Sequence, residues 1–262
     1  MIPRTLVVPL DGSLFAERAV PVAGAIAQRI GGRLLLVTAP LKGAIGPRDY
    51  FAEVAARFPD LPIDTTETEE FLPARAIAKV VDESDDRIVC MTSHGHGRVM
   101  WSMLGSTAEE VVRQSTRPVL LVGRNCHGDF LSPDAHLLTC VDGSEASERI
   151  APTAREWAEQ LGLAIDAAFV KHPLDVESAE HPESIVDPIV DAFGGPEHVR
   201  AHLLTGSYVA GTLADLAGDL PAGIIAMSSH GRTGLARATL GSVTMAVLQI
   251  APCPLLVTHF TP

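Results

Sequence analysis

The chain has 262 residues, of which 47% are hydrophobic and only 5% aromatic, a composition that is typical of a globular protein and excludes extended disorder. Its formal net charge is -12 at pH 7, and its pI is near 5.2. This acidic balance argues against nucleic-acid binding, because contact with a phosphate backbone requires clustered lysine and arginine. The length exceeds that of most single domains and suits two domains of about 130 residues.

Apolar strands alternate with helices along the first half. Residues 5–10 form a continuous apolar run that is typical of a buried strand, and residues 16–30 carry apolar side chains at helical spacing. Further strands are expected at 33–39, 63–68, 86–93 and 118–122, and further helices at 73–83 and from 106 to about 115. This alternation predicts right-handed crossovers and a parallel sheet with helices on both faces.

The second half of the chain repeats the first. The segment that starts at Leu6 aligns without gaps with the segment that starts at Leu137, so that Asp-Gly-Ser at 11–13 matches Asp-Gly-Ser at 142–144. Both segments then continue into a helical pattern that ends at glycine. The chain is therefore a tandem duplication.

The boundary between the copies is expected in a Gly, Asn and Pro-containing stretch. Downstream of the first motif the second copy holds extra residues, which we place in the proline-containing segment 171–190. The predicted organisation is a first domain at 1–125, a linker at 126–134 and a second domain at 135–262.

A second pair of motifs follows the expected fourth strand of each copy. Thr-Ser-His-Gly at 92–95 is matched by Ser-Ser-His-Gly at 228–231. In an open parallel sheet, ligands bind beyond the carboxyl ends of the strands, where the strand order reverses. Asp11 therefore converges with 92–95 on one crevice if the first and fourth strands are neighbours, and Asp142 does so with 228–231.

Leu-Gly-Ser opens a helix in both copies, at 104–106 and at 240–242. A helix N-terminus offers unpaired N–H groups and the positive end of a dipole, which attract phosphate. Ser106 with Glu109 also matches a capping box, which would satisfy the helix end with no ligand present. The second copy has Met245 in place of Glu109, so it lacks this box and one negative charge, and we favour it as the phosphate site.

Asp11 and Asp142 admit two interpretations from the residues alone. An aspartate after a strand often caps a turn through bonds from backbone N–H groups. A carboxylate beside a sheet crevice can instead accept hydrogen bonds from ribose hydroxyls. The occurrence of both motifs in both copies favours the ligand interpretation.

Other classes of site find less support. His94, His96 and His230 stand without further ligand residues at metal spacing, so no metal site is expected. The four cysteines show no C-x-x-C spacing, and three lie in runs where reduced, buried thiols are expected. The hydrolase elbow, the P-loop and the dinucleotide-binding pattern are absent from the sequence. Basic candidates for balancing phosphate charge are Arg98, Arg232 and Arg237.

Several motifs together resemble the universal stress protein family. They are VPLDGS at 8–13, SHGRTG at 229–234, the Leu-Gly-Ser helix starts, and the strands PVLLV and PCPLLV. Two complete copies resemble the tandem form of that family. The resemblance implies an α/β fold in which each domain is an open five-stranded parallel sheet of order 3-2-1-4-5 with helices on both faces. It also implies that the two domains pair about a pseudo-twofold axis, across which their fifth strands meet.

The resemblance also implies a nucleotide site in each copy, because members that bind ATP carry G-x-x-G-x9-G-[ST]. In the first copy this pattern falls on Thr92, Gly95, Gly105 and Ser106, followed by Thr107. In the second copy it falls on Ser228, Gly231, Gly241 and Ser242, followed by Val243. Both copies depart from the pattern at its first glycine.

Further site residues are implied on the ribose and adenine sides. The ribose-side aspartate of the family falls on Asp11 and Asp142, and the adenine side falls on Ala39 and Val170, with Pro9 and Cys140 two residues before each aspartate. The first copy departs further from the second, because Arg98 takes the place of Gly234, and Trp101 that of Arg237. ATP binding is therefore expected more strongly in the second domain.

The leading hypothesis is a non-catalytic stress regulator that binds ATP, with or without magnesium, as a sensor or switch. One alternative is a scaffold or chaperone-like tandem domain that needs no nucleotide. Another is a slow ATPase, although no residue stands out as a general base when Asp11 and Asp142 serve the ribose.

Partner and compartment expectations follow from the same reading. We expect an adenine nucleotide and an internal pseudo-dimer, leave a homodimer and protein partners open, and expect neither nucleic acid nor membrane as a partner. The apolar run near the start is too short to span a bilayer, and Asp11 ends it before any cleavage-site pattern. A cytoplasmic protein is expected.

Overall fold

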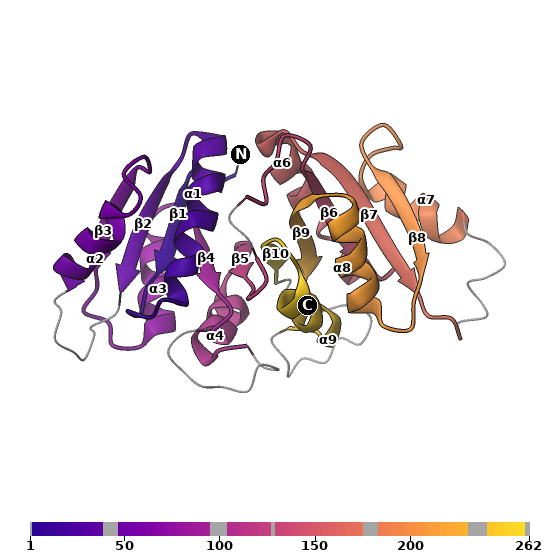
Figure 1. The fold of residues 1–262 in the computed structure, drawn as a ribbon. Coiled ribbons are helices and arrows are strands. Elements are labelled where there is room, and N and C mark those ends of the chain that lie inside the picture. Colours follow the sequence, from indigo (N-terminus) through magenta and orange to yellow (C-terminus); the bar gives the residue numbers. More distant parts are fainter. Residues whose placement is uncertain are drawn as a thin grey trace.

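The computed structural model describes residues 2–38, 47–94, 104–126, 129–174, 183–229 and 240–259. In these ranges, the strands of both halves join into one ten-stranded sheet, with helices on both faces (Figure 1). The strand order is β3-β2-β1-β4-β5-β10-β9-β6-β7-β8. Each half thus has the order 3-2-1-4-5, as predicted.

The strands of the first half are β1 (Thr5–Pro9), β2 (Arg33–Thr38), β3 (Ile63–Glu67), β4 (Arg87–Thr92) and β5 (Val119–Val122). Its helices are the short 3-10 turn η1 (Ala16–Arg18), then α1 (Ala19–Ile30), α2 (Pro47–Ala56), α3 (Pro73–Asp82) and α4 (Ser106–Gln114). The expected helix at 16–30 therefore divides into η1 and α1. Helix α2 is an element that the sequence analysis did not predict.

The strands of the second half are β6 (His136–Val141), β7 (Ala164–Lys171), β8 (Arg200–Thr205), β9 (Ala222–Ser228) and β10 (Leu255–Thr258). Its helices are α5 (Glu145–Glu148), α6 (Ala151–Leu161), α7 (Glu183–Ala192), α8 (Val209–Asp219) and α9 (Ser242–Ile250). None of the helices in the described ranges combines the length and the apolar character needed to cross a membrane.

The two halves meet through their fifth strands, in the middle of the sheet (Figure 1). Strand β10 pairs with β5 in the antiparallel sense, with Leu255 opposite Leu121 and Val257 opposite Val119. All other neighbouring strands run parallel. The predicted meeting of the fifth strands across a pseudo-twofold is confirmed, and it turns the duplication into an internal pseudo-dimer.

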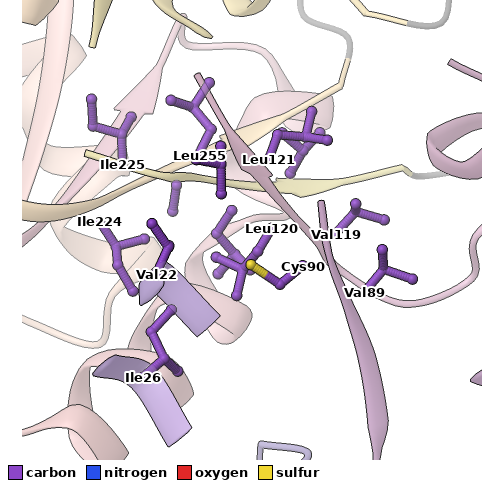
Figure 2. Packing of buried hydrophobic residues seen from close by; sticks show 14 of the residues in the cluster. Val22, Ile26, Val89, Cys90, Val119, Leu120, Leu121, Ile224, Ile225 and Leu255 are labelled. Carbon is purple, nitrogen blue, oxygen red and sulfur yellow. The ribbon is translucent and has the colours of Figure 1, made fainter. Parts of the chain in front are cut away.

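The apolar core runs through both halves without interruption. Figure 2 shows Val22 and Ile26 of α1 gathered with Leu120 of β5 and Ile224 of β9. The side chain of Arg29, at the end of α1, also donates a 2.9 Å hydrogen bond from Nε to the carbonyl oxygen of Leu161 in α6. Because burial of apolar surface is the main favourable term in folding, the halves stabilise each other.

Two glycines end the first long helix of each half, as the helical patterns predicted. Gly31 after α1 has a φ of 63°, and Gly162 after α6 has a φ of 64°. Both lie in the left-handed region, which glycine adopts without the steric cost of a Cβ. These caps set the sharp return of the chain into β2 and β7.

Candidate functional site

An aspartate turn follows the first strand of each half. Asp11 follows β1, and its Oδ1 accepts hydrogen bonds from Ser13 N at 3.0 Å and Ser13 Oγ at 2.6 Å. Asp142 follows β6, and its Oδ1 accepts bonds of the same lengths from the N and Oγ of Ser144. The glycine between aspartate and serine has a φ of 81° in the first turn and 76° in the second, so only glycine fits there without strain. Both carboxylates are therefore held in one orientation at the strand end.

The turns lie beside the second pair of motifs, as the topology predicted. Strand β1 pairs with β4, which ends at Thr92, and β6 pairs with β9, which ends at Ser228. Because these neighbours run parallel, their carboxyl ends share one edge of the sheet. Each aspartate turn thus stands next to the motif of its own copy, where the strand order reverses.

Backbone hydrogen bonds tie each helix start to the end of its strand. Gly105 N donates to Ser93 O at 2.8 Å, and Gly241 N donates to Ser229 O at 2.7 Å. In both copies the serine amide is itself bonded to the fifth strand, since Ser93 N donates to Val122 O and Ser229 N to Thr258 O. The helix start, the fourth strand and the fifth strand therefore form one fixed unit.

The helix starts contradict the capping-box interpretation. Helix α4 begins at Ser106 with Gly105 as its N-cap, a residue that has no side chain to make a capping hydrogen bond. Ser106 is the first helical residue, one position too late for the cap of such a box. Helix α9 begins in the same way, with Gly241 as N-cap and no side-chain cap. The first amides of each helix have no acceptor within the helix, and they form a donor set suited to an anion.

The two N-cap glycines differ in the space around them. A Cβ on Gly105 would lie 3.2 Å from Ser93 O and 3.4 Å from the Cα of His94, so the neighbouring backbone would have to shift slightly to admit a side chain there. On Gly241 the nearest atom would be Ser229 O at 3.4 Å, an ordinary contact. Both residues have extended backbone angles that any residue adopts. Among the described residues, packing leaves room for a Cβ at 241, so the close contact seen at Gly105 does not account for this glycine.

The residues that replace the first glycine of the pattern are buried. Thr92 turns its hydroxyl onto its own loop, where Oγ1 donates to His94 O at 2.6 Å. Ser228 O accepts a 3.3 Å bond from Oγ1 of Thr244 in α9. The Thr92 side chain and the Ser228 backbone thus both take part in the protein's own hydrogen bonds at the edge of each site.

The other predicted residues that the structure describes lie at or near the carboxyl ends of strands or at the helix starts of their own half. Pro9 ends β1 opposite Val37, and Val170 lies in β7 near its carboxyl end. Cys140 lies in β6, and burial raises the pKa of its thiol from 9.0 to about 12. Ser106, Thr107, Ser242 and Val243 begin the two helices, whereas Ala39, Gly95, Gly231, His96, His230, Arg98, Trp101, Arg232, Gly234 and Arg237 lie outside the described residues.

Two histidines hydrogen-bond to matching serines. Ser93 Oγ lies 3.0 Å from His94 Nδ1 in the first half, and Ser229 Oγ lies 2.9 Å from His259 Nδ1 in the second. The sequence analysis missed His259, which follows β10 and carries no motif. Within the described residues, no group of three or more histidine, cysteine or acidic side chains is arranged so that it could hold a metal ion.

A polar network that the sequence analysis also missed connects α2 to the first aspartate turn. Tyr50 donates a 3.0 Å hydrogen bond to Glu17 Oε1, and Arg57 forms a 2.7 Å ion pair with Glu17 Oε2. Burial raises the pKa of Tyr50, and the negative charges of Glu17 and Asp11 raise it further. The helical spacing of the buried side chains at Tyr50, Phe51 and Val54 was the signal that could have revealed α2.

Comparison with known proteins gives the same family for both halves. The model of the universal stress protein family matches residues 40–123 and 135–259. A universal stress protein of Mycobacterium tuberculosis H37Rv is 30% identical over 207 residues, which cover 72% of this chain and 67% of that protein. Another from the same strain is 26% identical over 201 residues, which cover 71% of this chain and 65% of that protein. The chain thus spans about two thirds of the length of these curated relatives.

A solved structure agrees with this fold. A universal stress protein from Archaeoglobus fulgidus matches with a TM-score of 0.67 at 19% identity, and the match covers 99% of both chains. A universal stress protein solved in complex with cAMP matches half of this chain at 21% identity, with a TM-score of 0.41. The first likeness extends over both halves of the sheet.

Proposed function

This chain belongs to the universal stress protein family, and we propose that it is a regulatory protein that binds ATP without turning it over. The observation that carries the proposal is the adjacency of two kinds of ligand-binding group. A carboxylate held at the end of β6 stands beside a helix start that has glycine as its N-cap and is tied to β9, and the first half repeats the arrangement. The carboxylate suits ribose hydroxyls, and the helix start suits phosphate.

Binding energy sets the number of groups that must act together. A helix end contributes about 0.3–2 kcal/mol, and a hydrogen bond to a charged group about 1.5–3 kcal/mol. Micromolar affinity needs about 8 kcal/mol. In the proposal, Asp142 holds the ribose, the amides of Ser242 and Val243 hold phosphate, and the carboxyl ends of β6 and β7 hold the base.

The absence of a side chain at Gly241 supports close approach of the phosphate to the backbone. A Cβ there has room among the described residues, so close approach of a bound anion is a physical reason for glycine at this position, beside the preference for glycine over alanine at an N-cap. Asp11 and Asp142 serve the ribose, and neither is then placed to activate water as a general base. The bound nucleotide acts as a signal, which requires that it bind one state of the protein better than another.

The test is isothermal titration calorimetry of ATP with magnesium into the full chain. Ser242→Glu and Ser106→Glu each place a negative charge at an exposed first residue of a helix, where the dipole favours the charge but phosphate is repelled. Each variant is expected to abolish one of two binding events. Gly218→Val in α8, where a Cβ would meet nothing within 4 Å, is the control and should bind as the unmutated protein does.

Two outcomes would overturn the proposal. No saturable ATP binding in the unmutated protein, confirmed by equilibrium dialysis, would favour the scaffold function. The buried side chains of Thr92 and Ser228, which replace the first glycine of the pattern, would then explain why no nucleotide binds. ADP release that is lost in Ser242→Glu would instead establish an ATPase.

A further inference from the structure

The two aspartate turns differ in one hydroxyl group. In the second turn, Ser147 Oγ accepts a 3.1 Å hydrogen bond from Asp142 N and donates a 2.9 Å bond to Ser144 O. Ser147 is only 3% exposed, and both bonds are partly buried. In the gapless alignment of the two halves, the residue that matches Ser147 is Ala16, which has no hydroxyl.

The remaining bonds of the two turns are nearly the same. Ser13 and Ser144 each hold the aspartate Oδ1 through N and Oγ at equal distances. The serine Oγ then accepts a bond from the backbone amide three residues on, from Ala16 at 3.1 Å and from Ser147 at 3.2 Å. The Ser147 hydroxyl is therefore an addition to a common framework, not a rearrangement of it.

The added hydroxyl coincides with a more regular turn. After Asp142, Ser144 caps the short helix α5, which begins at Glu145. After Asp11, the chain forms only the 3-10 turn η1, whose N-cap Phe15 makes no side-chain hydrogen bond. The Ser147 hydroxyl thus bridges Asp142 N and Ser144 O, two backbone atoms that the bonds of the Asp142 carboxylate do not involve.

We propose that Ser147 is a positioning residue that makes the second half the tighter nucleotide site, so that the two sites fill in sequence. This inference rests on the proposed function. By holding the Asp142 backbone, Ser147 keeps the carboxylate ready for the ribose hydroxyls, and the turn then loses less conformational entropy when the ligand binds. Glu109 in the first turn of α4 adds to the asymmetry, because Met245 matches it in α9 and carries no charge to repel phosphate.

The test isolates each site in the full chain. In the Ser106→Glu background, only the second site binds, and Ser147→Ala is expected to weaken its affinity for ATP about tenfold, the size of one hydrogen bond. In the Ser242→Glu background, only the first site binds, and Ala16→Ser is expected to strengthen it. Calorimetry measures both, with ATP and with 2′,3′-dideoxy-ATP, which lacks the ribose hydroxyls.

The dideoxy ligand separates positioning from a merely structural role. Ser147→Ala should leave the affinity for 2′,3′-dideoxy-ATP unchanged, and an equal loss for both ligands would overturn the inference. Unchanged ATP affinity in Ser147→Ala, or equal affinity of the two sites, would also overturn it while the proposed function stands. Failure of the unmutated protein to bind ATP would overturn both.

Hydrogen exchange without ligand tests the Ser147 bridge between Asp142 N and Ser144 O directly. The amide of Asp142 should exchange its hydrogen slowly in the unmutated protein and about tenfold or more faster in Ser147→Ala. Equal exchange in the two proteins would show that the bridge does not hold the turn, and would remove the basis of the inference.

Discussion

Gly241 N donates a 2.7 Å hydrogen bond to Ser229 O, which ties the start of α9 to the carboxyl end of β9. The matching bond in the first half joins Gly105 N to Ser93 O at 2.8 Å. The two bonds have similar lengths, but a Cβ would have less space at Gly105 than at Gly241. This difference leads to the first prediction.

Replacement of the two glycines by alanine should separate packing from ligand access. Gly105→Ala is expected to lower the free energy of unfolding by about 1 kcal/mol more than Gly241→Ala, because its Cβ would lie 3.2 Å from a backbone oxygen. The cost of alanine at an N-cap is common to both. Urea unfolding measures the difference, and equal losses would contradict it. Gly241→Ala should nevertheless weaken ATP binding at the second site.

Asp166 in β7 is a buried carboxylate, and its replacement should destabilise the second half. Its Oδ1 lies 2.6 Å from His202 Nε2, its Oδ2 is bonded to His136 Nδ1, and its side chain is 1% exposed. Asp166→Asn removes the charge that both imidazoles face, at an expected cost of about 3 kcal/mol in the free energy of unfolding.

The control for Asp166→Asn is Asp215→Asn on α8, outside this cluster, which should change stability by less than about 0.5 kcal/mol. In the first half, Leu35 occupies the position of Asp166, as the matching strand registers show. The cluster is therefore no requirement of the fold. A loss below about 1 kcal/mol for Asp166→Asn would contradict the prediction.

The buried thiols predict a loss of stability at alkaline pH. Burial raises the pKa of Cys140 and of Cys126 from 9.0 to about 12, while in the unfolded chain these thiols ionise near their ordinary value. Between those pH values the folded state binds more protons than the unfolded state, so the free energy of unfolding falls as pH rises. Urea unfolding between about pH 8 and pH 11 measures the slope.

Cys140→Ala should reduce that alkaline slope. The native Cys140 thiol should also resist a thiol reagent at about pH 8 that labels it in urea, because this thiol is buried in the folded protein. Rapid labelling of the folded protein would show that β6 opens easily and would contradict the burial on which the prediction rests.

Tyr50→Phe tests the network that fastens α2 beside the first aspartate turn. The variant loses the hydrogen bond to Glu17 Oε1, at an expected cost of about 1 kcal/mol in the free energy of unfolding. Because burial and nearby negative charges raise the pKa of Tyr50, ultraviolet titration up to about pH 11 should give the same ionisation signal with and without this residue. A smaller signal in Tyr50→Phe would contradict the raised pKa.

The sequence was sufficient for much of the architecture, because local patterns report directly on local structure. Continuous apolar runs predicted β1, β4 and β5, and the placement of Pro73 and Gly162 predicted the start of α3 and the end of α6. The duplication was visible because Asp11 and Asp142 stand in equal contexts. The resemblance to a family then supplied the strand order and the meeting of the fifth strands, which periodicity cannot predict.

Tertiary structure decided what depends on contacts between distant segments. Helix α2 escaped prediction although its buried side chains have helical spacing. The capping-box interpretation of Ser106 was wrong, because Gly105 is tied to Ser93 and takes the N-cap position. The cluster around Asp166 and the bond between Ser229 and His259 join residues that are about 30 or more positions apart. The sequence alone determined which residues each copy carries, but only the folded chain decided which of them meet, because spatial neighbours in a parallel sheet come from strands far apart in sequence.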